Sequence, residues 1–428
     1  MRDAPISNAR RRELGLLVAS ALVAALGMAL ACLALDQSPV RALRVTAVGA
    51  GFVVTSLLLR AEKRGRDTQL LPYASLLCGL GIVLLWRIDP TLASKQVVWM
   101  LLGLAALLAT YFLVDDVASL ARSKYTAGAL AVVLLGVTML LGIEVNGARL
   151  WLGVKDLFVF QPGEVAKVLM CLFLAGYVAE KGPIIRAQVA FRPGVVFPGL
   201  KYVGPLILMV VFCLAIFVLQ RDLGAAALFF GLFVAVTYLA TGRKTYALLS
   251  VILFVGGMVA AAHFFPHVNV RIGAWLNPWS DAESGGYQIL QSLYSLAAGG
   301  VTGVGVGQGF PELLPAAATD MVFSVAAEEL GLAGTFALLL LYVLMTARSF
   351  AIAWQARHPY GALLAACLAT VFGLQTLVIV GGCLRLVPLT GITLPFVSYG
   401  GTSIVVNFIA LGLLLAVSRD CLPPARED

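Results

Sequence analysis

Apolar segments of about twenty residues recur along the whole chain, and they constrain the fold more than any other feature. Of the 428 residues, 61% are hydrophobic and only 12% are charged, whereas roughly 25% of the residues in a soluble domain are charged. A helix needs about 20 predominantly apolar residues to cross the hydrocarbon core of a bilayer. The sequence therefore predicts an all-α integral membrane protein rather than a soluble one.

This length criterion predicts about twelve transmembrane helices. Their approximate ranges are 14–35, 42–59, 70–86, 96–114, 124–143, 161–180, 202–220, 223–240, 245–265, 322–347, 360–383 and 398–418. The first apolar run is longer than the core of a secretory signal peptide, which has about 7–15 residues. We interpret it as a membrane anchor that stays in the protein. An even number of crossings places both termini on the same side of the membrane.

The basic residues are concentrated in alternate connecting segments, and this asymmetry sets the orientation. With the N-terminus inside, most of the 30 basic residues fall in inner segments, including Arg10, Arg11, Arg12 and the connector 181–201. Loops on the cytoplasmic side of membrane proteins are enriched in Lys and Arg. We therefore expect both termini to be cytoplasmic. Because this topology accounts for the net charge of +8, nucleic acid is not an expected partner.

The connecting segments indicate one helical membrane domain and no separate soluble domain. Most connections are short, but an outer segment at about 266–321 is much longer, and the outer segment 144–160 is polar and aromatic. The seven cysteines lie almost entirely in apolar runs and form no CxxC pattern, so we interpret them as buried apolar side chains. The three histidines are too scattered to form a metal cage.

The stretch "NPWSDAESGGYQILQS" (277–292) places two carboxylates on a polar outer segment. Asp281 and Glu283 precede a Gly-Gly pair that lets the backbone fold closely. Tyr287, Gln288 and Gln291 offer hydrogen bonds of the kind that sugars use. The residues alone leave two interpretations open. The stretch is either a solvent-exposed loop whose acidic residues keep it hydrated or part of a site that binds a polar ligand.

Ionisable residues inside apolar segments are functional candidates, because inserting each one costs about 2.5–3.5 kcal/mol. "QPGEVAK" carries Glu164 and Lys167, which lie three residues apart on one helix face and can pair. The pair either locks two helices together or leaves Lys167, with Arg149 of "NGARLW", to bind an anionic group. A diphosphate would accept charge-assisted hydrogen bonds from such residues.

Three further segments combine polar residues with interrupted apolar patterns. Asp222 of "LQRDLG" suits either a helix cap or a site. In "ATDMVFSVAAEELGL", Asp320 begins a helix and Glu328 lies deeper, where a carboxylate should face the bundle interior. The segment "RLVPLTGITLPFVSYGGTS" (385–403) has two prolines and three glycines. Irregular backbone at membrane depth is tolerated only where it is buried in protein or lines a wet cavity.

These segments resemble, in order, the signature segments of a known family. "NGARLWLG", "FQPGEVAK", "QRDLG", "GYQILQS", "GVGVGQG", "TDMVFSVAAEELGL" and "PLTGITLPFVSYGGTS" are similar to those of the shape, elongation, division and sporulation (SEDS) family, typified by RodA and FtsW. The resemblance covers about residues 70 to 418. Arg221 stands where the family usually has proline, and Gly163 and Thr402 stand where it usually has serine. The extra helical pair and "PLTGIT" favour the RodA-like branch.

The resemblance implies a division of the chain and a set of site residues. Residues 1–68 would form a cytoplasmic tail and two extra transmembrane helices, 69–420 the ten-helix family core, and 421–428 a cytoplasmic tail. Asp281 matches the essential acidic residue of the family, whereas Glu283 falls where no carboxylate is required. The candidate substrate-binding residues are Arg149, Glu164, Lys167, Asp222, Tyr287, Gln288, Gln291, Asp320, Glu328, Ser398 and Ser403.

The resemblance also implies an activity. The family members are peptidoglycan glycosyltransferases, which polymerise lipid II at the outer face of the bacterial cytoplasmic membrane during elongation or division, together with a class B penicillin-binding protein. Asp281 would act as the base or hold a divalent cation, Mg²⁺ or Mn²⁺, and no organic cofactor is expected. A flippase or transporter of lipid-linked precursors is the main alternative, because buried charges and broken helices fit that class too. A scaffold without chemistry would leave Asp281 unexplained.

Overall fold

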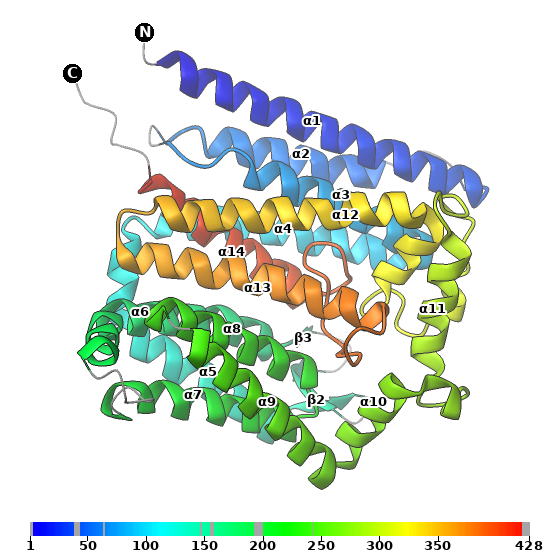
Figure 1. Cartoon of the computed structure of the whole chain (residues 1–428). Coiled ribbons are helices and arrows are strands. Elements are labelled where there is room, and N and C mark those ends of the chain that lie inside the picture. Colours follow the sequence, from blue (N-terminus) through cyan, green and yellow to red (C-terminus); the bar gives the residue numbers. More distant parts are fainter. Residues whose placement is uncertain are drawn as a thin grey trace.

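The computed structural model describes residues 3–37, 43–62, 65–145, 148–154, 158–191, 200–242 and 244–421. Apart from Cys421, the predicted tail 421–428 lies outside the described residues, and the inner connector 181–201 is described only in part. In Figure 1 the long helices run side by side, and the two chain ends lie at the same end of the bundle.

Fourteen α-helices account for most of the described residues. They are α1 (Asp3–Ala34), α2 (Leu43–Leu58), α3 (Leu70–Ile88), α4 (Pro90–Leu113), α5 (Lys124–Leu141), α6 (Pro162–Phe191), α7 (Leu200–Leu219), α8 (Leu223–Thr241), α9 (Lys244–Phe264), α10 (Pro266–Leu276), α11 (Tyr287–Gly299), α12 (Val322–Gln355), α13 (Pro359–Cys383) and α14 (Gly401–Arg419). Short 3₁₀ helices lie at η2 (Val117–Ser123), η3 (Pro278–Asp281) and η4 (Pro311–Leu313).

The helices match the predicted membrane spans in order. Among the described residues, eight helices are long and apolar enough to cross a membrane, and the pair α9–α10, bent by 112°, adds a ninth by the same criterion. Shorter apolar helices lie within α2, α7 and α8. Each of the twelve predicted ranges therefore overlaps a helix. The prediction of a helical, multi-pass membrane protein is confirmed, while the number of crossings stays a prediction.

Local signals place the helix ends. Asp89 accepts a hydrogen bond from the backbone N–H of Thr91 at 2.7 Å, and Pro90 occupies the first helical position of α4. An N-cap acid followed by proline is a strong helix start. For this reason α4 begins earlier than the predicted residue 96.

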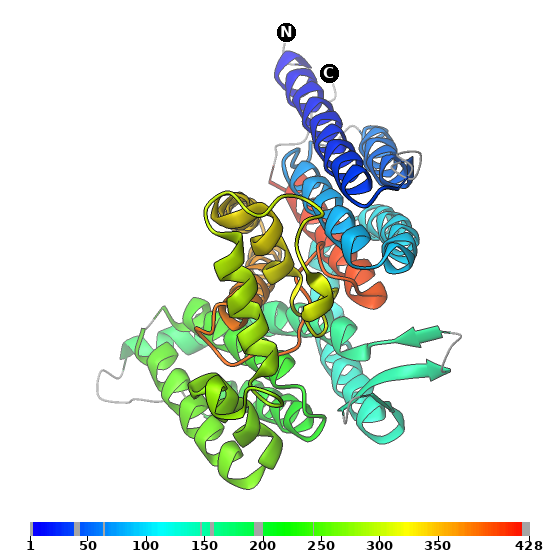
Figure 2. The same ribbon diagram turned by 90° about the vertical axis from the view of Figure 1, so that its right-hand side faces the viewer.

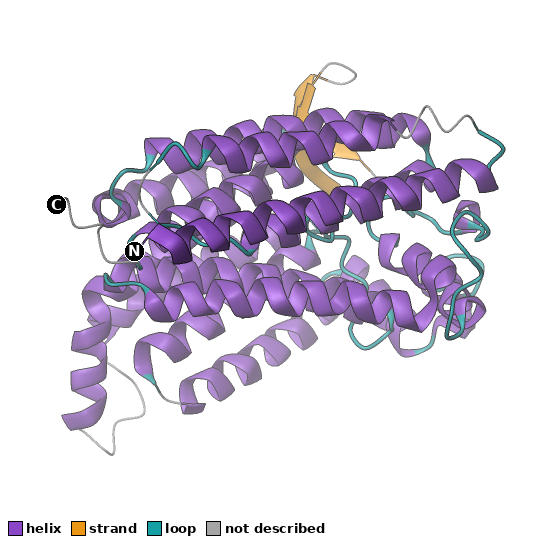
Figure 3. Ribbon diagram, turned by 90° about the horizontal axis from the view of Figure 1, so that it is seen from above, coloured by secondary structure: helices purple, strands orange, loops and turns teal. Residues whose placement is uncertain are grey.

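The sequence predicted an all-α protein, but the structure also contains a small β-sheet. Strands β1 (Ile143–Val145), β2 (Ala148–Val154) and β3 (Phe158–Phe160) form an antiparallel sheet in the order β1-β2-β3. In its register Glu144 pairs with Arg149, and Leu152 pairs with Phe160. The sheet occupies the segment 144–160 that the sequence marked as polar and aromatic, and Figure 3 shows its strands in orange beside the helices.

Aromatic side chains join the helices through the centre of the bundle. Phe52 of α2 lies 5.8 Å from Phe408 of α14, measured between ring centroids, and Phe408 lies 5.3 Å from Phe396. Phe396 in turn lies 5.8 Å from Phe372 of α13. Each of the four rings is at most 1% exposed. The irregular segment before α14 is therefore packed into the core around Phe396, whereas Leu386 and Val387, earlier in the same segment, are exposed.

Charged groups attach α1 and α2 to the rest of the bundle. Arg66, in the connection before α3, forms a buried ion pair with Glu13 of α1 at 2.9 Å. Its neighbour Asp67 pairs with Arg348 of α12 at 2.5 Å, and Arg419 at the end of α14 pairs with Glu62 at 3.2 Å. These contacts lie near the chain ends, away from α11 (Figure 1).

The outer segment 266–321 is largely folded rather than a flexible loop. It contains α10, η3, α11 and η4, and Figure 2 looks onto the end of the molecule where α11 lies. The residues after α11 pair with a break in α12. Leu332 N donates to Gly300 O at 2.9 Å, and Val304 N donates to Glu328 O at 2.9 Å. Gly331 takes φ 66° at the break, and an added Cβ would lie 2.2 Å from Gly303 N.

Candidate active site

Lys167 and Glu164 form the predicted ion pair on α6. Lys167 Nζ lies 2.7 Å from Glu164 Oε2, and the Lys167 side chain is 4% exposed. The ammonium group also donates to Gln375 Oε1 of α13 at 3.0 Å. The pair therefore links two helices, which is the structural interpretation of the sequence pattern. The geometry adds an amide partner that the sequence did not indicate.

The segment 385–403 is connected to this pair through side-chain hydrogen bonds. Gln375 Nε2 donates to Thr393 O at 2.7 Å, and Thr393 Oγ1 shares a hydrogen bond of 2.8 Å with Ser403 Oγ. Ser403 thus belongs to the same network as Lys167. Ser398 has a local role instead, because its hydroxyl donates to Thr319 O at 2.6 Å and accepts from Leu394 N at 2.9 Å.

Asp222 caps α8 and lies near other charged groups. Its carboxylate accepts from Ala225 N at 2.8 Å, so the capping interpretation holds. Burial raises the pKa of Asp222 to about 6, against the hydrogen bond from Ala225; the charges of Glu164 and Asp320 raise it further and that of Arg271 lowers it. The structure therefore brings Asp222, Glu164, Asp320 and Arg271 into electrostatic contact.

Asp320 lies in the loop before α12, against the segment 385–403. Cys383 Sγ contacts the backbone oxygen of Asp320 at 3.6 Å, and an added Cβ on Gly391 would lie 3.6 Å from Asp320 Oδ2. Burial raises the pKa of Asp320 to about 6, against the hydrogen bond from Thr319 and the charge of Arg271. Arg271 therefore acts on both raised carboxyl groups.

Glu328 has a different place from the other predicted acids. It is 5% exposed, and its Oε1 accepts from Phe310 N at 3.0 Å. The adjacent Glu329 accepts from Gly307 N at 3.0 Å and pairs with Arg87 of α3 at 3.2 Å. Both carboxylates face the interior, as predicted for acids at this depth. They hold the glycine-rich loop 303–309 against α12.

Asp281 lies at the exposed end of η3, with its carboxylate fixed by the next turn. Asp281 Oδ2 accepts from Ser284 Oγ at 2.7 Å and from Gly285 N at 2.9 Å. These two hydrogen bonds lower the pKa of Asp281 below its usual value. Glu283 is also exposed. Asp281 is therefore a solvent-facing anion with a defined orientation.

The polar residues of α11 face the loop that precedes α12. Tyr287 Oη donates to Leu313 O and Gln288 Nε2 donates to Pro315 O, both at 3.5 Å. These are long hydrogen bonds and therefore weak. Gln291 is partly buried on the same helix. All three side chains keep capacity for other polar partners.

Arg149 lies on the sheet rather than on a helix. Its Nε lies 3.3 Å from Glu144 Oε2 on the neighbouring strand, and both side chains are 53% exposed. Exposed pairs of this kind contribute about 0–1 kcal/mol. Arg149 is thus accessible and only weakly held.

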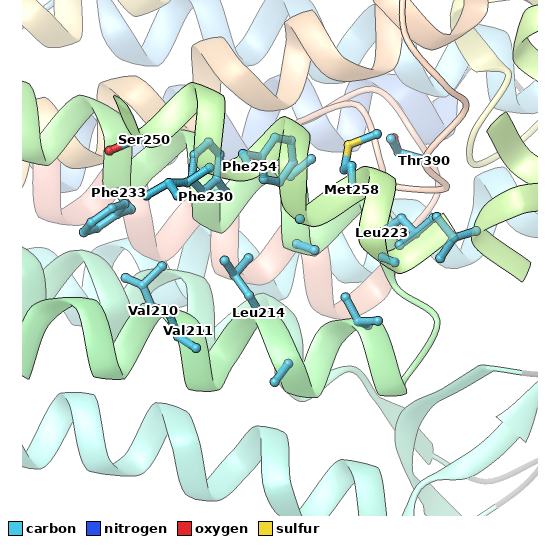
Figure 4. A pocket seen from close by; sticks show the side chains of 18 of the residues that line it. Val210, Val211, Leu214, Leu223, Phe230, Phe233, Ser250, Phe254, Met258 and Thr390 are labelled. Atoms are coloured by element: carbon cyan, nitrogen blue, oxygen red, sulfur yellow. The ribbon is translucent and has the colours of Figure 1, made fainter. Parts of the chain in front are cut away.

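A large apolar cavity lies among the helices that Figure 1 draws in green. It has a volume of about 920 Å³ and is lined mainly by α7, α8, α9 and α10. Figure 4 shows Val210 and Leu214 of α7 across from Phe230 of α8 and Phe254 of α9, with Thr390 at one end. Arg271 and Trp275 of α10 also line it. The sequence did not single out Arg271.

The residues present provide a limited set of metal ligands. Among the described residues, no group of three His, Cys, Asp or Glu side chains is close enough to hold an ion. Mg²⁺ needs less than this, since it often binds through one or two carboxylates together with substrate phosphates. Asp281 is exposed, so a divalent cation shared with a bound phosphate fits it, whereas a cage made only of protein side chains does not.

The fold defines a helical, multi-pass membrane protein with an apolar cavity whose lining includes Arg271. The family model described as cell cycle protein, covering FtsW, RodA and SpoVE, matches residues 75–421. The chain belongs to this family, and the resemblance seen in its motifs is confirmed.

Curated relatives and solved structures agree with this assignment. Peptidoglycan glycosyltransferase RodA of Mycobacterium leprae is 34% identical over 99% of this chain and 93% of its own length. The same-named protein of Mycobacterium tuberculosis is 36% identical over 89% of this chain and 85% of its own.

Among solved structures, a chain from a study of polymerization and crosslinking by a peptidoglycan synthase complex has a TM-score of 0.68 and 30% identity. It covers 85% of this chain and 99% of that chain. The rod shape determining protein RodA of Thermus thermophilus has a TM-score of 0.61 and 28% identity, over 84% of this chain and 98% of that chain.

Proposed function

We propose that this protein is a peptidoglycan glycosyltransferase that polymerises lipid II at the outer face of the bacterial cytoplasmic membrane. The observation that carries the proposal is the apolar cavity of about 920 Å³ whose lining includes Arg271 and Thr390. Asp222 and Asp320 lie within electrostatic reach of Arg271. A lipid-linked sugar has the matching chemistry, with a long apolar tail and an anionic, hydrogen-bonding head. The names of the mycobacterial relatives support the same activity.

The proposed topology places the site outside. Twelve spans, with a ten-helix core and an added N-terminal pair, leave both termini in the cytoplasm and the segment 266–321 at the outer surface. The positions of the chain ends support this topology, because both lie at the end of the bundle opposite α11 (Figure 1). Lipid II displayed on the outer leaflet would then meet α11, η3 and the open end of the cavity.

Asp281 is the proposed reacting carboxylate. The 4-hydroxyl of one lipid-linked disaccharide attacks the anomeric carbon of another, and undecaprenyl diphosphate leaves. A general base must lie within hydrogen-bond reach of the proton that it removes. Hydrogen bonds from Ser284 and Gly285 lower the pKa of Asp281 and favour its ionised form, and its exposure leaves room for a sugar. A Mg²⁺ or Mn²⁺ ion shared by Asp281 and the diphosphate would supply additional positive charge.

The other predicted site residues divide by position. Lys167, held by Glu164, keeps a positive charge inside the bundle, and Arg149 offers one at the sheet. Tyr287, Gln288 and Gln291 lie on the helix that follows Asp281, where they can bind sugar hydroxyls. Ser403 and Asp320 support the segment 385–403.

We also propose a class B penicillin-binding protein as the partner that crosslinks the glycan strands. A similar chain in a peptidoglycan synthase complex supports this partner. Such a partner would allow crosslinking to follow polymerisation without release of the strand.

The test is polymerisation of lipid II by the purified protein with its partner. Replacing Asp281 by Asn or Ala should lower the rate by at least about 100-fold, because general-base catalysis commonly contributes 10²–10⁴-fold. Glu283→Ala is the matched control, since it removes a neighbouring exposed carboxylate and should stay active. Polymer formed by Asp281→Asn at the wild-type rate would reject the role of Asp281. Transbilayer movement of lipid II without polymer would favour the flippase.

A further inference from the structure

The large cavity has a single charged residue in its described lining. Its walls come from apolar side chains of α7, α8 and α9, with a few hydroxyl groups, and Arg271 of α10 is the only charged residue among the described residues that line it. A cation at the edge of an otherwise apolar pocket is a specific feature, because pockets use a few polar groups to fix the orientation of a ligand.

The guanidinium of Arg271 has hydrogen-bonding capacity left for a ligand. Its Nη1 approaches Leu389 O and Thr390 O, both at 3.3 Å. Arginine carries five N–H donors in a planar fork, so these two long contacts to uncharged carbonyl groups engage only part of it. They also tie the guanidinium to the segment 385–403, so that its position at the end of the cavity is fixed.

Other cations in the region are engaged differently. Lys167 is buried between Glu164 and Gln375, and Arg149 pairs with Glu144 on the exposed sheet. Neither of them lines the cavity. A headgroup attached to a chain inside the cavity would therefore meet Arg271.

We infer that Arg271 binds the diphosphate of a polyprenyl-diphosphate-linked sugar whose hydrocarbon chain occupies the cavity between α7, α8, α9 and α10. This inference rests on the proposed function, which it deepens by assigning the headgroup contact. Guanidinium groups match phosphate oxygens with paired, charge-assisted hydrogen bonds. A bound diphosphate would also lie beside the segment 385–403, which joins Arg271 to the network of Thr393 and Ser403.

The charge of Arg271 acts on Asp222 and Asp320, but these acids do not cancel its proposed role. The Asp222 carboxylate is already used as the cap of α8. Burial disfavours the charged form of both acids. The guanidinium therefore keeps net positive character toward a ligand that enters from the cavity, while the acids limit how many anionic groups the site accepts.

The experiment measures binding of three lipids of the same chain length to the purified full-length protein. The probes are undecaprenyl diphosphate, undecaprenyl phosphate and undecaprenol. Wild-type protein should bind the diphosphate most tightly. Arg271→Gln should weaken diphosphate binding by about 10- to 100-fold, the effect of losing hydrogen bonds to a charged group. Undecaprenol binding should stay within about twofold, because the tail contacts are retained. Arg271→Lys should fall between wild type and Arg271→Gln.

Arg221→Gln is the matched control. Arg221 is exposed in the turn between α7 and α8 and does not line the cavity, so its loss should leave diphosphate selectivity unchanged. Equal binding of the diphosphate by wild type and Arg271→Gln would overturn the inference. So would an equal loss of undecaprenol binding, because that would show a change in cavity shape.

Polymerisation of lipid II, measured in parallel, separates the inference from the proposed function. Selective loss of diphosphate binding in Arg271→Gln would support the inference even if no variant polymerised lipid II, and only the proposed function would then fail. If wild type polymerises lipid II and Arg271→Gln does so with an unchanged KM, the proposed function stands and the role of Arg271 is rejected.

Discussion

Lys167 shows how a single buried charge can depend on partners that are distant in the sequence. The spacing with Glu164 predicted the ion pair, but Gln375 lies in another helix and completes the environment of the ammonium group. The amide nitrogen of Gln375 in turn donates a hydrogen bond to the backbone oxygen of Thr393. The orientation of that amide is therefore set by Lys167 on one side and by a backbone oxygen on the other.

Exchanging the two charges should abolish polymerisation while the protein still inserts. In Glu164→Lys with Lys167→Glu, the carboxylate at position 167 would face the Gln375 carbonyl oxygen, and turning the amide would break its hydrogen bond to Thr393. Exchange of the Lys124–Glu180 pair, which joins α5 to α6, is the control and should leave activity intact. Full activity in the Glu164–Lys167 exchange would show that this pair has only a structural role.

Asp320 should make the stability of the protein depend on pH. Burial raises its pKa in the folded state from 3.8 to about 6, so folding takes up a proton between these values. The stabilisation that comes from the neutral Asp320 carboxyl group is fully present below its ordinary pKa of 3.8 and is lost as the pH rises to about 6. Asp320→Asn should therefore raise the melting temperature relative to wild type above about pH 7, and this gain should shrink toward pH 4. A pH-independent difference would contradict this assignment.

At the level of elements, the N-terminal pair α1–α2 is held by buried charges as well as by apolar packing. Glu13 of α1 and Arg66 form an ion pair in which the side chains are 0% and 4% exposed. Arg66 also donates to Asp67 O at 2.9 Å, and Asp67 pairs with Arg348 of α12. The N-terminal pair is therefore linked to the family core through the connection that separates them.

Removing one partner of this buried pair should destabilise the whole bundle. Glu13→Gln leaves the Arg66 guanidinium without its carboxylate, at a cost of about 3 kcal/mol. Glu13→Leu combined with Arg66→Met removes both charges and should recover much of that loss. The measurement is the melting temperature of the purified protein in one detergent. A single variant as stable as wild type would show that the pair does not hold α1 in place.

The sequence predicted some elements better than others for a physical reason. Each long apolar run coincides with a helix because the bilayer length and the helical rise together fix its size. Strands β1 and β3 have three residues each, fewer than the about 4–8 residues over which alternation predicts a strand. Helices α10 and α11 have 11 and 13 residues, fewer than the about 20 that a crossing needs, so the length criterion left them inside the predicted outer segment.

At the level of the whole molecule, the site is assembled from segments that only the fold brings together. Glu164 and Lys167 come from α6, Asp222 from the start of α8, Arg271 from α10 and Ser403 from the start of α14. Their polar character in apolar surroundings marked most of them in the sequence. Arg271 carried no such mark, because a lone arginine in a long outer segment is ordinary. Its position at the cavity follows from the 112° bend between α9 and α10.

The proposed orientation of the whole chain can be tested with cysteine labelling. Six of the seven native cysteines are buried, and Cys421 is partly buried near the chain end that we place inside, so the background reaction from outside should be low. Glu283 and Ser123 are both exposed in the structure. Ser123 lies in the connection between α4 and α5, which the topology puts in the cytoplasm. In cells whose outer layers admit a membrane-impermeant maleimide, Glu283→Cys should therefore react at once. Ser123→Cys should react only after the inner membrane is permeabilised. The reverse pattern would contradict the proposed orientation, and Asp281 would then face the cytoplasm.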